Sequence, residues 1–274
     1  MKITMLGPAH KTRILTAMIL AAILLGCLAA GGWPLRLLLC GVSLLAMWEL
    51  YQIFWPGWGN AAGKAAGMIC GGIITLGTGC SGWGGLLALL GLVTILAALR
   101  FTIRYGQGKG GTLREELPLL FGIMYIPMSL QFALGLNMVE QILALLAAAA
   151  SDIGAYYAGS LLGRHKICPA ISPHKSWEGF AGGLLLNAAT VALYGSLAPL
   201  PPELSGIAPW QWFLAGVIFS LLAQFGDFFE SALKREAGVK DSSRLLPGHG
   251  GLLDRLDSIV LVLPAYVLLK WLWL

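Results

Sequence analysis

Long apolar segments alternate with short polar loops along the chain. A helix needs about 20 consecutive apolar residues to cross the hydrocarbon core of a bilayer. On that rule the pattern predicts nine membrane-spanning helices, approximately at residues 14–31, 35–55, 61–80, 83–99, 117–135, 139–160, 178–198, 209–229 and 257–273. We therefore expect an all-α, polytopic integral membrane protein.

The composition supports this class. The 274-residue chain is 57% hydrophobic and 11% charged, and its mean hydropathy is +0.78, whereas soluble domains carry roughly 25% charged residues. No polar linker divides the chain. We expect a single membrane domain, residues 1–274, in which residues 1–100 form N-terminal spans and residues 100–274 form the catalytic part.

The positions of the cations predict the orientation in the membrane. With a cytoplasmic N-terminus, 16 of the 18 lysines and arginines fall on the cytoplasmic side, and only Arg36 and Lys270 fall on the other. Cytoplasmic loops of membrane proteins carry such an excess of positive charge. The net charge of +5 is therefore interpreted as topology, and no nucleic-acid partner is expected.

Residues 231–257 form the most charged segment of the chain. They include the cations Lys234, Arg235, Lys240, Arg244 and Arg255 and the acids Glu236, Asp241, Asp254 and Asp257. Between two apolar spans, such a segment is costly unless it lines a water-filled site or lies at the membrane surface. We expect it to line a polar cavity that opens to the cytosol and holds the active site.

Asp152 lies inside the sixth predicted span, where an ionisable residue is a functional hypothesis by default. Helical spacing places Asp152, Tyr156, Gly159 and Gly163 on one face, so the carboxylate and the phenol could share a cavity. The glycines are also spaced for close helix packing. The structural alternative for Asp152 is an acid that makes only interhelical hydrogen bonds.

A second polar motif, residues 171–179, precedes the seventh span. Ser176 is expected to cap the helix that Glu178 begins. Because the amides at a helix N-terminus favour an anion, the neighbouring Lys175 makes this a plausible phosphate site. An ordinary basic loop is the alternative.

Carboxylates recur near the cytosolic ends of the last two spans. Asp227 lies on the same helical face as Glu230 and Lys234, and Asp254 and Asp257 are expected to share a face of the last helix. Converging carboxylates would repel one another without a cation, and oxygen ligands of this kind suit Mg²⁺. A salt-bridge network is the structural alternative. The pattern favours phosphoryl-type chemistry between a metal-bound nucleotide and a lipid phosphate, without a P-loop.

The segment SALKREAGVKDSSRLLPGHGGLLDRLD at residues 231–257 resembles the signature of the phosphatidate cytidylyltransferases, also called CDP-diacylglycerol synthases. Residues 152–163 and 172–179 resemble the same family, with His174 where a lysine is common. The resemblance covers roughly residues 100–274. It implies that CTP and phosphatidate react to give CDP-diacylglycerol and pyrophosphate, at the cytosolic leaflet of a bacterial inner membrane.

The resemblance also implies cofactors, partners and site residues. Mg²⁺, with a possible second cation, would be held by Asp227, Asp254 and Asp257, and the enzyme would be a homodimer in contact with membrane lipid. Lys175 and Asp241 would join the three aspartates in catalysis. The substrates would be bound by Ser172, Lys175, Lys234, Arg235, Lys240, His249, Arg255, Asp152 and Glu178.

Two alternatives to this activity are a CTP-dependent polyprenol or lipid kinase and a transporter of anions or lipid phosphates. A kinase would release CDP, whereas a cytidylyltransferase releases pyrophosphate. A transporter would show no Mg²⁺-dependent turnover and would not require Asp254. The full signature at residues 231–257 favours the cytidylyltransferase.

Overall fold

The computed structural model describes residues 8–57, 60–77, 82–107, 113–243, 245–246 and 250–273. Within these ranges the regular elements are helices, accompanied by two isolated β-bridges. The predicted all-α class is confirmed. The contacts between residues divide the chain into two compact units, one made of Met1–Leu134 with Asp241–Arg255 and the other of Gly135–Lys240 with Leu256–Leu274.

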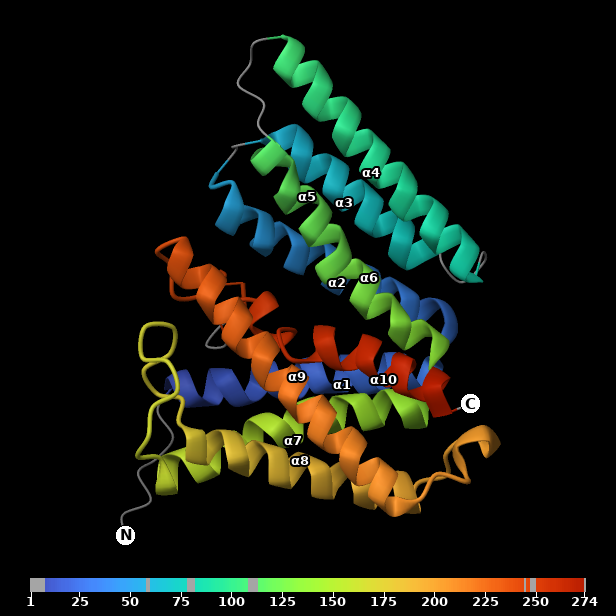
Figure 1. Cartoon of the computed structure of the whole chain (residues 1–274), viewed down its shortest axis with the longest axis vertical. Coiled ribbons are helices and arrows are strands. Elements are labelled where there is room, and N and C mark those ends of the chain that lie inside the picture. Colours follow the sequence, from blue (N-terminus) through green and yellow to red (C-terminus); the bar gives the residue numbers. More distant parts are fainter. Residues whose placement is uncertain are drawn as a thin grey trace. The chain divides into compact units, whose positions relative to one another are not determined.

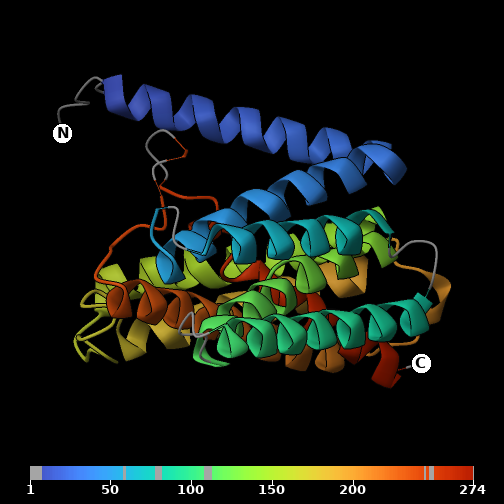
Figure 2. The same cartoon turned by 90° about the horizontal axis from the view of Figure 1, so that it is seen from above.

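The first unit packs its helices around α2 and α3. Its elements are α1 (Pro8–Ala30), α2 (Gly32–Phe54), α3 (Ala61–Gly77), α4 (Gly82–Gly106), α5 (Leu113–Tyr125), α6 (Pro127–Leu130), most of η2 (Gln131–Gly135) and η4 (Leu253–Arg255). Both views show α3, α4 and α5 running side by side (Figures 1 and 2). Tyr51 of α2 is fully buried, and its hydroxyl donates a hydrogen bond to the carbonyl oxygen of Leu119 at 3.1 Å.

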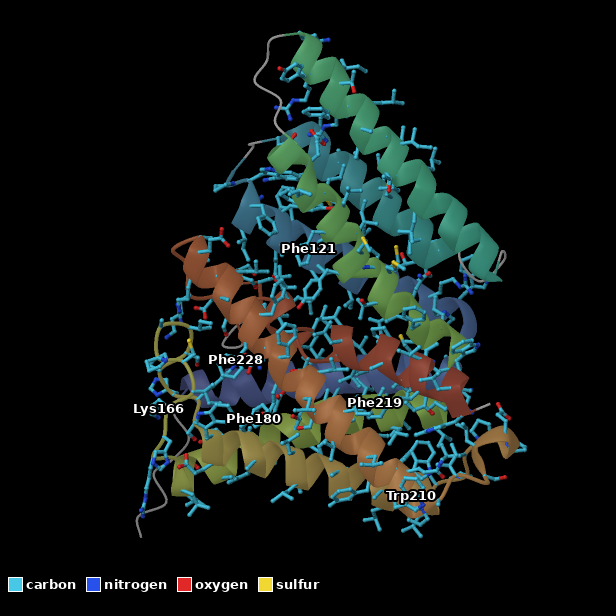
Figure 3. The ribbon with its side chains drawn as sticks, in the orientation of Figure 1. Phe121, Lys166, Phe180, Trp210, Phe219 and Phe228 are labelled. Carbon is cyan, nitrogen blue, oxygen red and sulfur yellow. The ribbon has the colours of Figure 1, made fainter. Side chains whose placement is uncertain are left out.

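The second unit packs α7 against α8, α9 and α10 (Figure 1). Its elements are α7 (Met138–Leu162), α8 (Trp177–Leu197), η3 (Pro202–Leu204), α9 (Pro209–Glu236) and α10 (Ile259–Trp273). Its core includes the fully buried Phe219, labelled in Figure 3, whose ring lies 5.9 Å from that of Tyr266. A 2.9 Å hydrogen bond between the hydroxyls of Ser151 and Ser220 joins α7 to α9.

Glycines allow α7 and α8 to approach closely. A Cβ added to Gly154 would lie 2.5 Å from the carbonyl oxygen of Gly182, and one added to Gly179 would lie 2.8 Å from that of Ala155. Because side chains are missing along this seam, the two backbones meet almost directly. This close packing was expected for the face that carries Gly159 and Gly163, and it places the polar residues of α7 beside the start of α8.

The predicted spans coincide with helices, but several boundaries differ; α1 begins already at Pro8, and α4 continues to Gly106. The segment predicted at 117–135 is divided into α5, α6 and η2, and α6 begins with Pro127, which has no N–H to continue a helix. Helix α9 continues to Glu236 instead of ending near residue 229. Asp254 lies in η4 and Asp257 precedes α10, so the expectation that these two share a face of the last helix is wrong.

Five helical segments in the described part of the chain are long and apolar enough to cross a membrane. They are Gly32–Phe54, Glu116–Gly135, Met138–Leu162, Trp177–Leu197 and Pro209–Glu236. Shorter apolar helices cover Ile14–Ala30, Ala61–Gly77 and Ile259–Trp273. The structure therefore supports an all-α membrane protein, while nine crossings and a single membrane domain stay predictions.

Candidate active site

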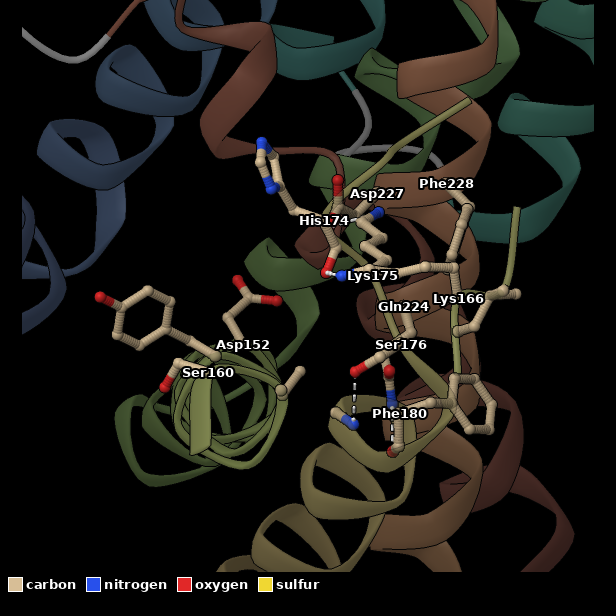
Figure 4. A pocket seen from close by; sticks show the side chains of 15 residues that line it. Asp152, Ser160, Lys166, His174, Lys175, Ser176, Phe180, Gln224, Asp227 and Phe228 are labelled. Carbon is tan, nitrogen blue, oxygen red and sulfur yellow. Dashed lines mark hydrogen bonds and ion pairs between the residues drawn. The ribbon is translucent and has the colours of Figure 1, made fainter. Parts of the chain in front are cut away.

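A polar pocket of about 480 Å³ lies within the second unit, between α7, the loop that follows it, the start of α8 and the middle of α9 (Figure 4). Typical small-molecule sites have volumes of roughly 300–1,000 Å³. The pocket is lined by Asp152, Ala155, Tyr156, Gly159, Ser160, Lys166, Ile167, His174, Lys175, Ser176, Gly179, Phe180, Gln224, Asp227 and Phe228.

An ion pair between Lys175 and Asp227 forms the charged centre of the pocket. The lysine Nζ lies 2.7 Å from Oδ2 of Asp227 and 3.9 Å from the centre of the Phe228 ring. The Lys175 and Asp227 side chains remain 23% and 37% exposed, although the Nζ atom of Lys175 is itself buried. The sequence predicted both residues as site residues, and the structure brings them together.

The loop that carries Lys175 is held by backbone hydrogen bonds. The N–H of Ile167 donates to the carbonyl oxygen of Lys175 at 3.3 Å, and the N–H of Trp177 donates to that of His165 at 2.9 Å. An antiparallel bridge pairs Lys166 with Ser176. These contacts fold the loop into a hairpin that fixes Lys175 beside α9.

Asp152 and Tyr156 line the pocket from α7, as their helical spacing predicts. Figure 4 shows the Asp152 carboxylate pointing into the space in front of Lys175 and Asp227. Asp152 is an exposed residue. The pocket therefore holds two carboxylates and one ammonium group at its centre.

The start of α8 follows the predicted cap, but Glu178 has a different environment from the one expected. The buried hydroxyl oxygen of Ser176 accepts a hydrogen bond from the N–H of Gly179 at 3.2 Å, which confirms the cap. The Glu178 carboxylate accepts hydrogen bonds from the backbone N–H groups of Arg164 and His165 and lies 2.6 Å from Nδ1 of His165. These contacts hold the end of α7, and substrate binding by Glu178 stays a prediction.

Two cations predicted to bind phosphate are engaged with protein groups. Lys234 is buried, and its Nζ lies 2.5 Å from Oε2 of Glu230 one helical turn earlier. Nε of Arg235 donates to the carbonyl oxygen of Ile171 at 3.2 Å, which ties the end of α9 to the loop of Lys175. Ser172 lies in the same loop, where its N–H donates to the carbonyl oxygen of Cys168 at 3.0 Å. Lys240 is exposed.

Asp257 lies ahead of α10, beside Gly226 of α9. Burial raises the pKa of Asp257 from 3.8 to about 7, and the negative charge of Asp227 adds to the effect. The N–H of Ser258 donates to Asp257 Oδ1 at 2.8 Å, which acts in the opposite direction. A divalent cation would relieve the effect of the Asp227 charge on Asp257, so these two carboxylates fit such an ion.

The remaining predicted residues belong to the first unit. The Asp254 carboxylate accepts hydrogen bonds from the N–H of Gly251 at 2.9 Å and, with a longer contact of 3.3 Å, from that of Ser242. Asp241 and Arg255 are exposed, and His249 lies outside the described residues. Within the described ranges, no three His, Cys, Asp or Glu side chains are grouped so that they could hold a metal ion.

Several pocket residues were not predicted from the sequence. Gln224 lies three residues before Asp227, so helical spacing could have identified it; its amide donates to the carbonyl oxygen of Phe180 at 3.2 Å (Figure 4). His174, which received no role from the sequence, and Lys166 also line the pocket. Lys166 lies beside His174 because its Nζ donates to the carbonyl oxygen of that residue at 3.3 Å.

An apolar cavity of about 340 Å³ adjoins the polar pocket. It is lined by Ile167, Cys168, Trp177, Phe180, Leu221, Phe225 and Phe228, and it shares Ile167, Phe180 and Phe228 with the polar pocket. Figure 3 shows the labelled Phe180 and Phe228 on α8 and α9. A pocket with charged groups beside an apolar cavity suits a ligand with a charged head and a hydrocarbon tail.

Comparison with known proteins assigns the chain to a family. The model of the cytidylyltransferase family matches residues 11–273. A protein of Staphylococcus epidermidis named phosphatidate cytidylyltransferase is 33% identical over 262 residues, which cover 93% of this chain and 96% of that protein. The protein of that name in Staphylococcus aureus is 34% identical over 264 residues with the same coverage.

A third relative matches a shorter part of the chain more closely. The phosphatidate cytidylyltransferase of Mycobacterium bovis is 47% identical over 116 residues, which cover 42% of this chain and 36% of that protein. The chain therefore matches about a third of the mycobacterial protein and nearly all of the staphylococcal ones. The resemblance carried by the signature residues is confirmed.

The raised pKa of Asp257 predicts a pH dependence of stability. Between pH 3.8 and about 7, Asp257 keeps its proton in the folded protein but has released it in the unfolded chain. Its contribution to stability is complete below about pH 4 and is lost as the pH rises to about 7. The Asp257→Asn variant has no such proton to lose. The Tm of the variant minus that of the unsubstituted protein should therefore increase by a few degrees as the pH rises from about 4 to about 7.

The measurement is thermal unfolding of both proteins in detergent with a chelator present, from pH 4 to pH 8. A Tm difference that stays constant across this range would show that Asp257 has an ordinary pKa in the folded protein.

Proposed function

We propose that this chain, which belongs to the cytidylyltransferase family, transfers the cytidylyl group of CTP to phosphatidate, giving CDP-diacylglycerol and pyrophosphate. One observation carries the proposal: the Lys175–Asp227 pair lies in a pocket that shares lining residues with an adjoining apolar cavity. The names of the relatives that match nearly the whole chain supply the substrates.

In the proposed reaction, a phosphate oxygen of phosphatidate attacks the α-phosphorus of CTP. A new P–O bond forms, the bond between the α-phosphorus and its bridging oxygen breaks, and pyrophosphate leaves with the electron pair. A phosphate monoester has a second pKa of about 6, so the nucleophile already carries negative charge near neutral pH. The protein therefore needs to position two anions and offset their charge more than it needs to remove a proton.

Lys175 is the group placed for this task. Its ammonium nitrogen is buried against Asp227 and the Phe228 ring, while the rest of the side chain lines the pocket and is partly exposed. Hydrogen bonds from such a cation to phosphate oxygens are stronger than those between neutral groups. In the proposal Lys175 binds phosphate, Asp227 and Gln224 keep the pocket in shape, and the apolar cavity between α8 and α9 takes the first part of an acyl chain.

We propose Asp227 and Asp257 as ligands of Mg²⁺, because both are carboxylates and the charge of Asp227 disfavours that of Asp257. Bound there, Mg²⁺ would offset the negative charge of the triphosphate and of the departing pyrophosphate. Asp254 stays a candidate ligand on the strength of the signature alone, as does a second cation.

The remaining parts of the proposal concern the membrane. We propose nine crossings with a cytoplasmic N-terminus, so that the pocket opens to the cytosol, where CTP is available. The distribution of lysine and arginine along the chain supports this orientation. The resemblance also implies that the protein forms a homodimer in a bacterial inner membrane. Crosslinking in native membranes tests this.

Replacing Lys175 tests the proposed function at its centre. Lys175→Met removes the positive charge while keeping much of the side-chain length, so kcat/KM should fall roughly 100- to 1000-fold. The measurement is pyrophosphate release and CDP-lipid formation from CTP and phosphatidate with Mg²⁺ in detergent.

Lys270→Met is a matched control in the same unit. Lys270 lies 2.6 Å from Glu140 and is 20% exposed, which closely resembles the geometry of Lys175 with Asp227. It should reduce stability but leave kcat/KM per folded molecule close to that of the unsubstituted protein. Release of CDP in place of pyrophosphate would support a lipid kinase, and a folded protein without turnover would support a transporter; either result overturns the proposal.

The metal proposal has a test that does not depend on activity. Mg²⁺ that binds only the folded protein should raise its Tm with increasing concentration. The increase should be lost in Asp227→Asn and in Asp257→Asn, because each removes a charged ligand. An equal increase in the variants would place the ion elsewhere, and no increase in the unsubstituted protein up to millimolar Mg²⁺ would contradict a metal site formed without substrate.

A further inference from the structure

Glu49, in the second half of α2, is 2% exposed, and its carboxylate accepts four hydrogen bonds from one loop of the signature. Oε1 accepts from the hydroxyl of Ser243 at 2.5 Å and from the N–H of Leu252 at 3.0 Å. Oε2 accepts from the hydroxyl of Ser242 at 2.9 Å and from the N–H of Leu253 at 2.7 Å. Each oxygen therefore binds one serine and one backbone amide.

A second carboxylate fastens the same loop from within. Asp254 accepts from the N–H groups of Ser242 and Gly251, and the N–H of Leu246 donates to the carbonyl oxygen of Gly250 at 2.9 Å. The described residues of the segment 242–253 thus donate to two carboxylates, Glu49 of α2 and Asp254 directly after the segment. All these residues belong to the first unit.

The position of Glu49 explains a glycine of the signature. A Cβ on Gly251 would lie 2.7 Å from Oε2 of Glu49 and would overlap the hydroxyl of Ser242. The next residues, Leu252 and Leu253, turn their amides toward the same carboxylate. A side chain at position 251 would therefore push the loop away from α2.

Burial makes the loop and Glu49 depend on each other. A desolvated carboxylate is strongly unfavourable unless donors replace the water it loses. The loop supplies four donors, two of them backbone amides that need an acceptor of their own once they are buried. The loop can leave α2 only by exposing a buried charge and both amides together.

We propose that Glu49 is a positioning residue for the transfer reaction. It sets the conformation of the signature loop. The inference rests on the proposed function, since the loop leads directly into Asp254 and Arg255 and follows Asp241, all candidate site residues. Glu49 itself contacts the loop and acts through it. A role for the N-terminal helices beyond crossing the membrane follows from this assignment.

Glu49→Gln is the sharpest variant because it keeps the size of the side chain. The amide of glutamine has one acceptor oxygen and one NH₂ donor. Whichever way it is turned, the NH₂ group faces either Leu252 or Leu253, whose N–H cannot rotate to become an acceptor. One buried backbone donor is therefore left without its partner.

Glu116→Gln is the matched control. Glu116 is 1% exposed in the same unit, and its carboxylate contacts two side chains of the described residues, with 3.3 Å to Nε of Arg100 and 3.4 Å to Nη1 of Arg104. Its replacement should lower Tm as much as that of Glu49. A purely structural role for Glu49 would leave kcat/KM of the two variants alike.

The experiment combines steady-state kinetics with hydrogen exchange of the full-length protein in detergent. In Glu49→Gln, kcat/KM for CTP should fall roughly ten- to hundredfold, and amide exchange in residues 242–253 should accelerate by a similar factor. Glu116→Gln should leave kcat/KM for CTP and the amide exchange of this loop close to the values of the unsubstituted protein. Adding Ser243→Ala to Glu49→Gln should cause no further loss, because the two residues act in one network.

The inference is overturned if Glu49→Gln leaves kcat/KM unchanged, or if it leaves exchange in the loop unchanged. Equal losses of kcat/KM in Glu49→Gln and Glu116→Gln would overturn it as well. Failure of the proposed function gives a different result. In that case the unsubstituted protein produces no CDP-lipid, while exchange in residues 242–253 still reports whether Glu49 holds the loop. Rapid exchange of this loop in the unsubstituted protein would contradict the anchoring whatever the activity.

Discussion

Buried carboxylates require a compensating charge or hydrogen-bond donors, and in both units this requirement fixes which segments meet. Glu49 joins α2 to the signature loop through four donors. Glu140 joins α7 to α10 through Lys270 at 2.6 Å and through the hydroxyl of Tyr266 at 3.2 Å. Leaving one such carboxylate without partners would cost several kcal/mol, so each contact specifies an arrangement that apolar packing alone would leave open.

The pocket is where this compensation is incomplete. The Glu230 side chain beside Lys234 is 1% exposed, whereas Lys175 and Asp227 are 23% and 37% exposed. An ion pair whose side chains are partly exposed can change partners when an anion or a cation arrives, although the Nζ atom of Lys175 is itself buried in the pair. Close packing of α7 on α8 brings Asp152 to the same place, because glycines line that seam. The pocket thereby combines fixed charges with room for a ligand and with an apolar neighbour for its tail.

Local patterns in the sequence predict much of this. The lengths of apolar segments locate the helices, and helical spacing with the loop motif brings Asp152, Tyr156, Lys175 and Asp227 to one pocket. Contacts between distant segments are not encoded locally. Ser242 lies 193 residues from Glu49, an acid in an apolar helix with no motif around it. The backbone contacts of Glu178 likewise depend on how the chain folds, whereas the pairing of Lys234 with Glu230, one helical turn earlier, follows from helical spacing.

The fate of the CTP phosphates tests the central claim most directly. Purified protein is incubated with phosphatidate and Mg²⁺, using CTP labelled in either the α- or the γ-phosphate. The account predicts that the α-label enters the lipid in equal amount to the pyrophosphate released, while the γ-label stays in pyrophosphate. Transfer of the γ-label to lipid, with the α-label left in CDP, would contradict it.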